Sequence, residues 1–302
     1  MIEAKGLTKR YGDRIAVDGI SFSAKQGEIV GLLGPNGAGK TTAMRMLTGF
    51  MPPTEGSAKI AGHDIIEDSL EARRNVGYLP ERVPLYPDMT VRGYVTFWAK
   101  LRGVKNSKTA VDAVLARFHL QDRQNQLVRH LSKGLKQRLG LAQALVHNPP
   151  VIILDEPTIG IDPQQVIEVR DAVRALGQNH TVLFSTHILS EAEQVCDRVL
   201  IINKGKVIAQ GKPADLRRQL QPGSTLFVVL HGADKKKARE LLAAVPGVTH
   251  VEAQGDGWQV KANADVRGEL SASIGAAGLT LLEMRPITTS LEDVFLELVK
   301  EV

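Results

Sequence analysis

The sequence has a single cysteine, Cys196, and no long apolar run. One thiol cannot form an internal disulfide, so the chain suits a reducing compartment, and we expect Cys196 to be a small buried apolar residue. The longest apolar stretches, such as residues 199–202, fall far short of the roughly 20 residues that cross a bilayer as a helix. Residues 1–5 carry charge and are not expected to begin a signal peptide. Any work at a membrane would therefore need another polypeptide.

Aromatic residues are also scarce, at 4% of the chain, and they do not alternate with clusters of Lys and Arg. Because nucleic-acid surfaces rely on such stripes, we expect no nucleic-acid partner. The net charge of +5 is unevenly spread, because residues 1–220 hold 30 Lys and Arg against 22 Asp and Glu. This mildly basic first part suits nucleotide phosphates or an anionic membrane face, and a solvated surface without function explains it equally well. With 43% hydrophobic and 24% charged residues, the 302 residues are typical of a soluble globular protein of about two domains.

One motif of high specificity is present, since residues 34–42 read GPNGAGKTT. Gly34, Gly39, Lys40 and Thr41 match the pattern G-x-x-x-x-G-K-[ST], after an apolar run typical of a strand and before helical spacing. Glycines let backbone N–H groups turn toward a phosphate, and the following helix adds its positive dipole end. Lys40 can reach the β- and γ-phosphates, and Thr41 can ligate Mg²⁺. The motif predicts a nucleoside triphosphate site; a glycine-rich surface turn is the weaker alternative.

Two carboxylates follow another apolar run, residues 151–154. A continuous run of this kind is typical of a parallel strand buried on both faces. Asp155 would then lie at the carboxyl end of the strand, where ligands bind in open α/β sheets. We expect Asp155 to hold Mg²⁺ through a water molecule, with Glu156 beside it. The alternative, a solvated turn, is disfavoured by the apolar residues that precede the pair.

The pattern along the chain predicts an α/β protein. Apolar alternation predicts strands around a turn at Gly12-Asp13, and helical spacing dominates from about 83 to 146, which indicates an inserted helical subdomain. The expected elements are strands at 2–7, 15–22 and 182–184, helices at 90–101, 109–118 and 134–146, and a hairpin of 199–203 with 207–210.

The composition changes near Gln221-Pro222-Gly223, where we place the boundary between domains 1–220 and 221–302. The second domain is predicted to run strand, helix, strand, strand, helix, strand, the split βαβ arrangement of small ferredoxin-like α+β domains. These elements are expected at 225–230, 235–245, 248–253, 258–261, 266–276 and 279–284. A last helix is expected from Leu291, capped by Ser290.

Together these motifs resemble the ATP-binding subunit of an ABC transporter. This family is separated from other phosphate-loop enzymes by the run Leu131-Ser132-Lys133-Gly134-Leu135, then Asp155-Glu156-Pro157-Thr158, then His187 after a further strand. The resemblance covers roughly residues 2–215 and implies a P-loop NTPase core of the ABC type, with an antiparallel β subdomain and an inserted helical subdomain. The family signature usually reads Leu-Ser-Gly-Gly-Gln, so this chain departs from it at Lys133 and Leu135.

The resemblance also implies roles for single residues. Glu156 would polarise the water that attacks the γ-phosphate, and His187 would contact that phosphate. Glu81, where most relatives carry glutamine, would ligate Mg²⁺ or the attacking water, and Tyr11 would stack on adenine. The remaining phosphate-loop contacts are expected from Asn36, Gly37, Ala38 and Thr42.

In this family two subunits share each nucleotide. Ser132, Lys133 and Gly134 would contact the γ-phosphate of ATP held by the opposite subunit, and Ser132 would also begin a helix. Lys133 loses the freedom of glycine at positive φ, and its side chain would either face solvent or add a charge toward the phosphate. Asp162 matches the loop that crosses the dimer interface. Whether the dimer joins identical or different subunits stays open.

The resemblance therefore implies an ATPase, using ATP and Mg²⁺, that lies on the cytoplasmic face of the cell membrane and energises a separate permease. The run Leu79-Pro80-Glu81 and the C-terminal tail are similar to those of ABC-2-type exporters of the drug, antibiotic and gliding type, so export is expected over import. One alternative is a soluble ABC ATPase acting on nucleic acid or ribosomes, but no coiled coil or second cassette is evident. Another is a P-loop kinase, which would lack the signature.

The region from Tyr78 to Trp98 holds five of the aromatic residues and lies where relatives receive the coupling helix of a permease. Tyr86, with its neighbour Pro87, is expected to be exposed for docking. For Tyr94, Phe97 and Trp98, docking and packing in the core of the helical subdomain are equally open.

Overall fold

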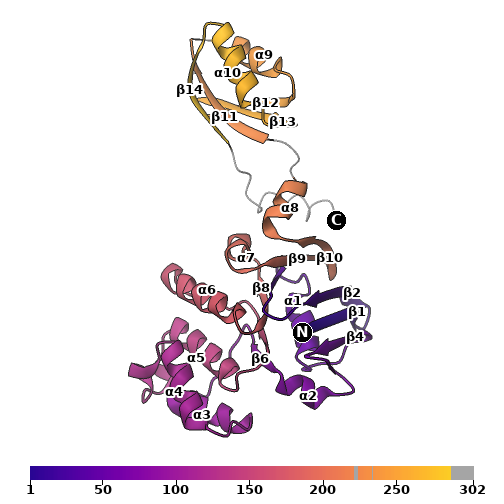
Figure 1. Cartoon of the computed structure of the whole chain (residues 1–302), viewed down its shortest axis with the longest axis vertical. Coiled ribbons are helices and arrows are strands. Elements are labelled where there is room, and N and C mark those ends of the chain that lie inside the picture. The colour runs from indigo at the N-terminus through magenta and orange to yellow at the C-terminus, as the bar shows by residue number, and fades with distance from the viewer. Residues whose placement is uncertain (221–223, 233, 287–302) are drawn as a thin grey trace. The chain divides into compact units, whose positions relative to one another are not determined.

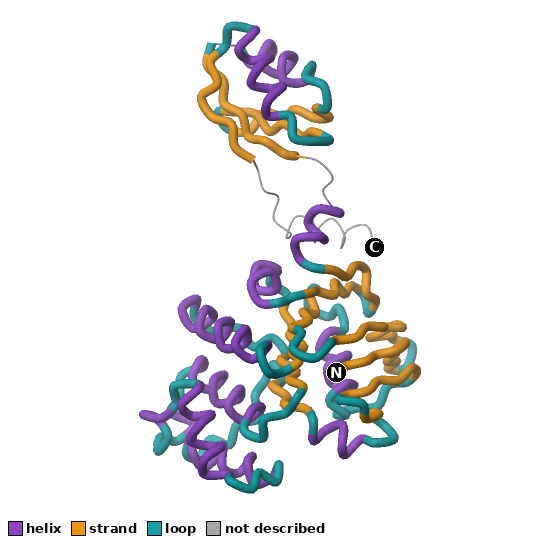
Figure 2. The backbone as a smooth tube through the Cα atoms, viewed as in Figure 1, coloured by secondary structure: helices purple, strands orange, loops and turns teal. Residues whose placement is uncertain are grey.

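The computed structural model describes residues 1–220, 224–232 and 234–286. The chain divides into two compact units, Met1–Pro213 and Ala214–Val302 (Figures 1 and 2). The domain boundary expected at 221–223 and the helix expected from Leu291 with its cap Ser290 lie outside the described residues. Within the described part of the chain, every helix is too short or too polar to span a membrane.

The first unit is built around a six-stranded sheet in the order β10-β9-β3-β8-β7-β6. Neighbouring strands run parallel except in the expected hairpin β9–β10, which is confirmed as antiparallel. The strands are β3 (Ile29–Leu33), β6 (Val76–Leu79), β7 (Val151–Leu154), β8 (Thr181–Thr186), β9 (Arg198–Asn203) and β10 (Lys206–Gly211). Strands β3, β7 and β8 are wholly buried, as parallel strands covered on both faces are. Their carboxyl ends meet at one edge of the sheet, which brings the predicted motifs together.

An antiparallel sheet in the order β2-β1-β4-β5 packs on the helix that follows the phosphate loop. These elements are β1 (Ile2–Tyr11), β2 (Arg14–Ala24), α1 (Lys40–Leu47), β4 (Glu55–Ile60) and β5 (His63–Asp64). Met44, Met46 and Leu47 of α1 share one apolar core with both sheets. The turn at Gly12-Asp13 is confirmed. Strand β1 runs beyond residue 7, where we expected it to end, because register shifts interrupt the alternation on which that prediction relied.

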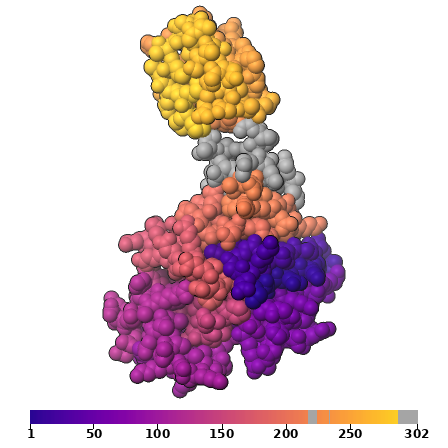
Figure 3. Space-filling model, viewed as in Figure 1, coloured from indigo at the N-terminus to yellow at the C-terminus, as the bar shows by residue number. Residues whose placement is uncertain are grey.

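Between β6 and β7 the chain forms a helical segment that reaches the surface apart from the antiparallel sheet (magenta and indigo in Figure 3). Its helices are α3 (Val91–Leu101), α4 (Ser107–Arg117) and α5 (Lys133–Leu145), with 3-10 turns η1 (Gln121–Arg123) and η2 (Val128–His130). The three helices lie within two residues of the expected bounds. Outside this segment are α2 (Ser69–Arg74), α6 (Pro163–Gly177), α7 (Leu189–Val195) and α8 (Pro213–Leu220).

The aromatic residues of this segment are divided between core and surface. Tyr94 is fully buried and Trp98 is half-buried, so both belong to the packing of the segment. Tyr86 is 45% exposed and Pro87 is exposed as expected, and the Tyr86 ring packs edge-on against Phe97, with 5.6 Å between the ring centroids. The surface pair is confirmed as exposed.

The second unit holds a four-stranded antiparallel sheet in the order β12-β13-β11-β14. Its elements are β11 (Ser224–His231), α9 (Lys235–Ala243), β12 (Val248–Gln254), β13 (Gly257–Ala262), α10 (Arg267–Ala276) and β14 (Thr280–Pro286). The expected order of strands and helices is confirmed. Both helices contribute to one core, in which Leu242, Leu270 and Ile274 pack with Trp258 and Val260 from the sheet.

Candidate nucleotide site

The loop between β3 and α1 has the backbone that a phosphate cradle needs. Gly37 and Gly39 have φ of 82° and 105°, in the left-handed region that favours glycine, and Gly39 caps α1. A Cβ atom on Gly34 would lie 2.3 Å from the carbonyl oxygen of Ile202, so the loop passes directly over β9. These constraints turn the loop back over the helix N-terminus, where backbone N–H groups and the helix dipole favour an anion.

Lys40 is the buried cation of this site, and it is only 5% exposed. Its ammonium donates hydrogen bonds to the carbonyls of Gly34 at 2.7 Å and Pro35 at 3.3 Å. It also lies 3.1 Å from Oε1 of Glu156, an ion pair without hydrogen-bond geometry. A buried charge is costly unless it is paired, and here one charge balances the other. A phosphate oxygen could replace any of these acceptors.

Asp155 has the chemistry of a ligand for a hard cation. Its Oδ1 accepts hydrogen bonds from Thr41 Oγ1 at 3.2 Å and Ser185 Oγ at 2.7 Å, while Oδ2 is buried without a hydrogen-bond partner. Burial raises the pKa of this carboxyl above its ordinary value, against the two hydrogen bonds, and the charges of Glu156 and Glu81 raise it further. Carboxylate and hydroxyl oxygens are ligands that Mg²⁺ prefers, so the unpaired Oδ2 and the all-oxygen donor set fit this ion.

Glu156 occupies a strained position beside Asp155. Its φ of 47° lies in the left-handed region, which is uncommon for a residue with a side chain. The backbone N–H of Glu156 donates to Ser185 Oγ at 2.9 Å, and Oε2 lies 2.8 Å from Nδ1 of His187. The buried carboxylate is therefore held between His187 and Lys40, while Ser185 holds the backbone of the same residue. Such a group can accept a proton from a water molecule next to it.

A hollow of about 280 Å³ lies over the phosphate loop. The predicted residues that line it are Asn36, Gly37, Ala38, Gly39, Lys40, Thr41, Thr42, Glu81 and Glu156. Three residues that we did not predict line it too: Arg14, Ala16 and Ile159. Arg14 begins β2, directly after the turn that follows Tyr11, and adds a cation to the hollow. Since the residues of this turn are far from the loop in sequence, only the folded chain reveals the contact.

Other predicted residues do not line this hollow. Tyr11 ends β1, is 48% exposed, and donates a hydrogen bond to Met51 Sδ at 3.0 Å. Ser132 caps α5 as expected, accepting from the backbone N–H of Leu135 at 3.3 Å. Asp162 caps α6 in the same way, through the N–H of Gln165 at 3.0 Å. The structure thus separates a phosphate-loop half from a signature half.

Within the signature half, the two caps lie close together. A Cβ atom on Gly134 would lie 1.6 Å from Oε1 of Gln165, so the amide of α6 covers this glycine. The side chain of Lys133 runs past Gly160, whose Cβ position lies 2.0 Å from the lysine Nζ. Lys133 is exposed, and its stem is directed toward the loop before α6. A lysine at this position therefore adds a contact between the N-terminus of α5 and the loop before α6.

The fold and the site define a nucleotide-binding α/β protein of the phosphate-loop class. The family described as ABC transporter matches residues 17–159. The chain is 37% identical to the bacitracin transport ATP-binding protein BcrA of Bacillus licheniformis, over 99% of this chain and 97% of that protein. It is 39% identical to the Nod factor export ATP-binding protein I of Burkholderia thailandensis, over 98% and 96%. It also superposes on a dimeric ATP-binding cassette, MJ0796, solved in a post-hydrolysis state with ADP and Pi.

The superposition on that cassette has a TM-score of 0.65 at 26% identity and covers 70% of this chain and 99% of the cassette. The identities with the two relatives extend over almost the whole of each chain. This chain therefore belongs to the ABC transporter family, as one of its ATP-binding subunits, and it has the ABC cassette fold.

Proposed function

We propose that this chain hydrolyses ATP as one half of a dimer and thereby drives export through a separate membrane permease. The observation that carries the proposal is the connected cluster at the carboxyl ends of β3, β7 and β8. There Lys40 meets Glu156 at 3.1 Å, Glu156 meets His187 at 2.8 Å, and Thr41 meets Asp155 at 3.2 Å. Export is favoured by the names of the relatives, which include bacitracin transport and Nod factor export.

In the proposed reaction each residue of the cluster does what its position allows. The phosphate loop binds the triphosphate, and the Lys40 ammonium turns from the Gly34 carbonyl to the β- and γ-phosphates. Glu156 orients a water molecule and accepts its proton. His187 holds the Glu156 carboxylate from the far side and reaches toward the γ-phosphate. Tyr11, on the exposed end of β1, stacks on the adenine.

Thr41, Asp155 and Glu81 are the residues that would hold Mg²⁺ in this site. The bound ion would supply charge neutralisation for the phosphate oxygens. The chain's own contribution is to fix the donors, since Ser185 and Thr41 both orient the Asp155 carboxylate. Glu81 follows β6 and lines the same hollow, so its carboxylate could reach the ion or the attacking water.

We further propose that the signature half of each chain completes the site of another. Ser132, Lys133 and Gly134 lie at the N-terminus of α5, where N–H groups are free for an anion, and they do not line the phosphate hollow of their own chain. Asp162 lies at the start of α6 and would face the partner subunit. The dimeric state of the related cassette supports this arrangement. Identical or different subunits would both satisfy it.

The first test compares wild type with Glu156→Gln in ATP hydrolysis, together with size analysis in ATP and Mg²⁺. Loss of a general base is expected to lower kcat by about 10²- to 10⁴-fold. Because bound ATP would then persist, Glu156→Gln is also expected to elute as a dimer. Glu67→Gln, at an exposed position, is the matched control and should behave as wild type. Normal hydrolysis by Glu156→Gln, or full activity of a chain held monomeric, would overturn the proposal.

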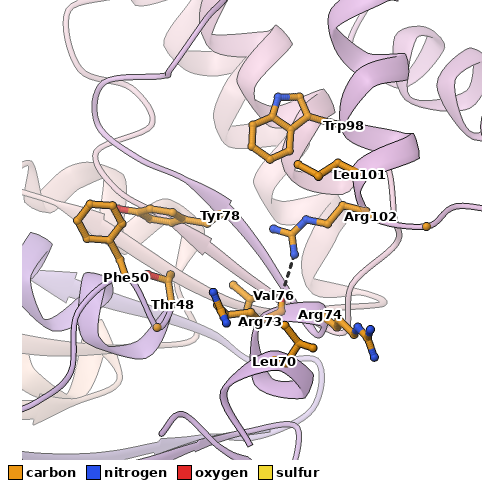
Figure 4. Close-up of a pocket in the computed structure, with 12 residues that line it drawn as sticks. Thr48, Phe50, Leu70, Arg73, Arg74, Val76, Tyr78, Trp98, Leu101 and Arg102 are labelled. Carbon is orange, nitrogen blue, oxygen red and sulfur yellow. Dashed lines mark hydrogen bonds between the residues drawn. The ribbon is translucent and has the colours of Figure 1, made fainter.

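The permease is proposed to dock in a groove of about 810 Å³ on the first unit (Figure 4). The groove is linked to the nucleotide site at two points. Helix α1 starts at Lys40 in the nucleotide hollow, and Thr48 and Phe50 beyond its other end line the groove. Strand β6 places Tyr78 in the groove, and Glu81 beyond its end lines the hollow. A partner that shifts the residues of the groove could therefore shift Lys40 through α1 and Glu81 through β6.

The groove has an apolar and a cationic part. Phe50, Leu70 and Leu101 are 72%, 58% and 63% exposed, which is unusual for side chains so apolar when they gather at one site. Arg102 donates a hydrogen bond to the carbonyl of Arg73 at 2.7 Å (Figure 4), and neither guanidinium has a carboxylate partner among the residues that the structure describes. Burial, with the positive charge of Arg73, lowers the pKa of Arg102. We therefore propose that the docking segment of the permease carries apolar side chains and a carboxylate.

Leu101→Asp tests this docking, in cells that also express a candidate permease. The variant adds a like charge to an acidic segment, so sedimentation with membranes and export should be lost while ATP hydrolysis by the purified chain is kept. Tyr86→Ala is expected to weaken coupling in the same sense, also with basal hydrolysis intact. Leu282→Asp, at an equally exposed position of the second unit, is the control. Loss of basal hydrolysis in Leu101→Asp or in Tyr86→Ala would count against the assignment.

Within the second unit, residues 221–302 are proposed to be a ferredoxin-like accessory domain. Supporting this class, β13 lies between β11 and β12, and β11 lies between β13 and β14, so each crossover helix joins strands separated by one other. We also propose that the chain lies on the cytoplasmic face of the membrane. This location depends on the proposed permease, so without a permease the chain would not be held there.

A further inference from the structure

A buried carboxylate outside the nucleotide hollow connects the two loops that carry the proposed catalytic groups. Glu191, in the first turn of α7, is 3% exposed. Its Oε2 accepts a hydrogen bond from Thr158 Oγ1 at 2.8 Å and another from Thr186 Oγ1 at 2.8 Å. Among the described residues this carboxylate has no Lys, Arg or His within ion-pair distance. A single oxygen atom thus joins two segments of the chain.

These segments are the ones that end in Glu156 and His187. Thr158 follows Glu156 after one residue, and Thr186 immediately precedes His187. The two proposed catalytic side chains also contact each other, with 2.8 Å between Nδ1 of His187 and Oε2 of Glu156. Glu191 and the Glu156–His187 contact therefore close a small ring of interactions, with α7 as its fixed side.

The conformation of Glu156 makes this support necessary. A residue at φ 47° is strained, and such strain persists only where neighbouring contacts hold the backbone. Ser185 holds the loop at the N–H of Glu156, and the Thr158–Glu191 hydrogen bond holds it two residues further on. His187 has a 37% exposed side chain, and the anchored residue before it limits where the ring can go.

A carboxylate suits this position better than an apolar residue. Thr158 and Thr186 are 5% and 0% exposed, so water cannot replace Glu191 as the acceptor of their hydroxyls. Thr186 Oγ1 has in addition only a long contact of 3.5 Å to the carbonyl of Ile188. Hydrogen bonds to an ionised acceptor are about twice as strong as neutral ones. The energy of these two bonds is what offsets the burial of the Glu191 charge.

We propose that Glu191 is a positioning residue, which keeps the loops of Glu156 and His187 in the geometry that hydrolysis requires. The inference rests on the proposed ATPase function. It adds Glu191, which lies outside the nucleotide hollow and acts through the two loops that it holds. Because the phosphate loop is a separate segment, Glu191 should affect turnover and leave the binding of ATP nearly unchanged.

The test measures kcat and KM for ATP, with thermal unfolding in parallel. Glu191→Ala is expected to lower kcat at least about ten-fold, the effect of losing hydrogen bonds to a charged group, with KM changed by less than about two-fold. Glu191→Gln keeps an acceptor for both hydroxyls and should recover most of the lost kcat. Gln194→Ala, exposed on the same helix, is the control and should match wild type.

Two further variants decide the matter if Glu191→Ala fails to fold. Thr158→Val and Thr186→Val are close in shape to the native side chains, and each removes one donor to Glu191. Thr158→Val is the cleaner of the two, because Thr186 Oγ1 also accepts a hydrogen bond from the Ile188 N–H at 3.0 Å. Each variant should lower kcat. Because both threonines donate to the same oxygen of Glu191, the fold-decrease in kcat of the double variant should be smaller than the product of the two single fold-decreases. Unchanged kcat in every folded variant, or a matching rise in KM, would overturn the inference. A wild type without ATPase activity would instead overturn the proposed function.

Discussion

The two units of this chain differ in what they bury. Among the described residues, every buried polar or charged side chain lies in the first unit, while the core of the second, around Trp258 and Leu270, is wholly apolar. The buried charged groups of the first unit, Lys40, Asp155, Glu156 and Glu191, gather near the carboxyl ends of β3, β7 and β8. Burying a charge costs stability, so a cluster of buried charges indicates a functional site, where the residues serve a reaction and do not serve packing.

The largest effect is expected when a charge is removed from the buried cluster of the first unit. Lys40→Met removes the cation of the site and leaves the Glu156 carboxylate buried without its partner. ATP hydrolysis should fall by about 10²- to 10³-fold or more, as when a main electrostatic donor is lost. Steady-state hydrolysis measures it, with Lys59→Met, exposed on β4, as control.

The same variant also tests whether Lys40 and Glu156 stabilise each other. Breaking one side of a buried pair typically costs about 3–5 kcal/mol of stability, whereas removing both charges costs less. Urea unfolding should therefore rank Lys40→Met below the double variant with Glu156→Gln. Equal stability of the two would mean that the pair contributes nothing to the fold.

In the second unit the residues most sensitive to substitution are expected in the apolar core. Leu270→Ala in α10 is expected to destabilise that unit by about 2–5 kcal/mol through lost packing, with ATP hydrolysis unchanged. Trp258 reports its unfolding by fluorescence if Trp98, the other tryptophan, is replaced by Phe. Leu282→Ala, at a position 61% exposed, is the control. A drop in hydrolysis with Leu270→Ala would show that the units depend on each other.

Local patterns were enough to predict much of this molecule. The phosphate loop, the buried strand before Asp155, the hairpin of β9 and β10, and the order of elements in the second unit all follow from periodicity and turn residues. Each depends on residues that are neighbours in sequence. The helices α3 to α5 were placed for the same reason, because their apolar faces repeat every three or four residues.

The contacts that could not be predicted depend on which strands are neighbours in space. Ser185 supports Asp155 and Glu156 because β7 and β8 are adjacent and parallel, with Leu154 opposite Phe184, and nothing in either segment states this pairing. Arg14 and Glu191 were missed in the same way. Strands β4 and β5 and helix α2 escaped prediction because they are short and lack a clear apolar period.

Ser185 provides the next prediction, since it is uncharged yet lies inside the charged cluster. Ser185→Ala leaves the N–H of Glu156 without its acceptor and takes one of two hydrogen bonds from Asp155 Oδ1. Turnover should fall by about 10- to 100-fold, in keeping with the loss of bonds to charged groups. Ser185→Thr keeps the hydroxyl and should retain more activity than Ser185→Ala. Equal activity of the two variants would show that the hydroxyl has no role.

The smallest expected effect concerns pH and again distinguishes the units. Burial and the nearby Arg102 lower the pKa of His147 to about 4, and its Nε2 donates to the carbonyl of Val76 at 3.2 Å. The unfolded chain binds a proton at this residue below pH of about 6.5, whereas the folded chain binds it only near 4. Stability of the first unit should therefore fall as pH drops below 6.5, by roughly 1–2 kcal/mol between pH 7 and 5. His147→Gln should remove that part of the pH dependence, whereas His250→Gln, exposed in the second unit, should leave it intact. An unchanged slope of stability against pH in His147→Gln would show that the buried imidazole does not control it.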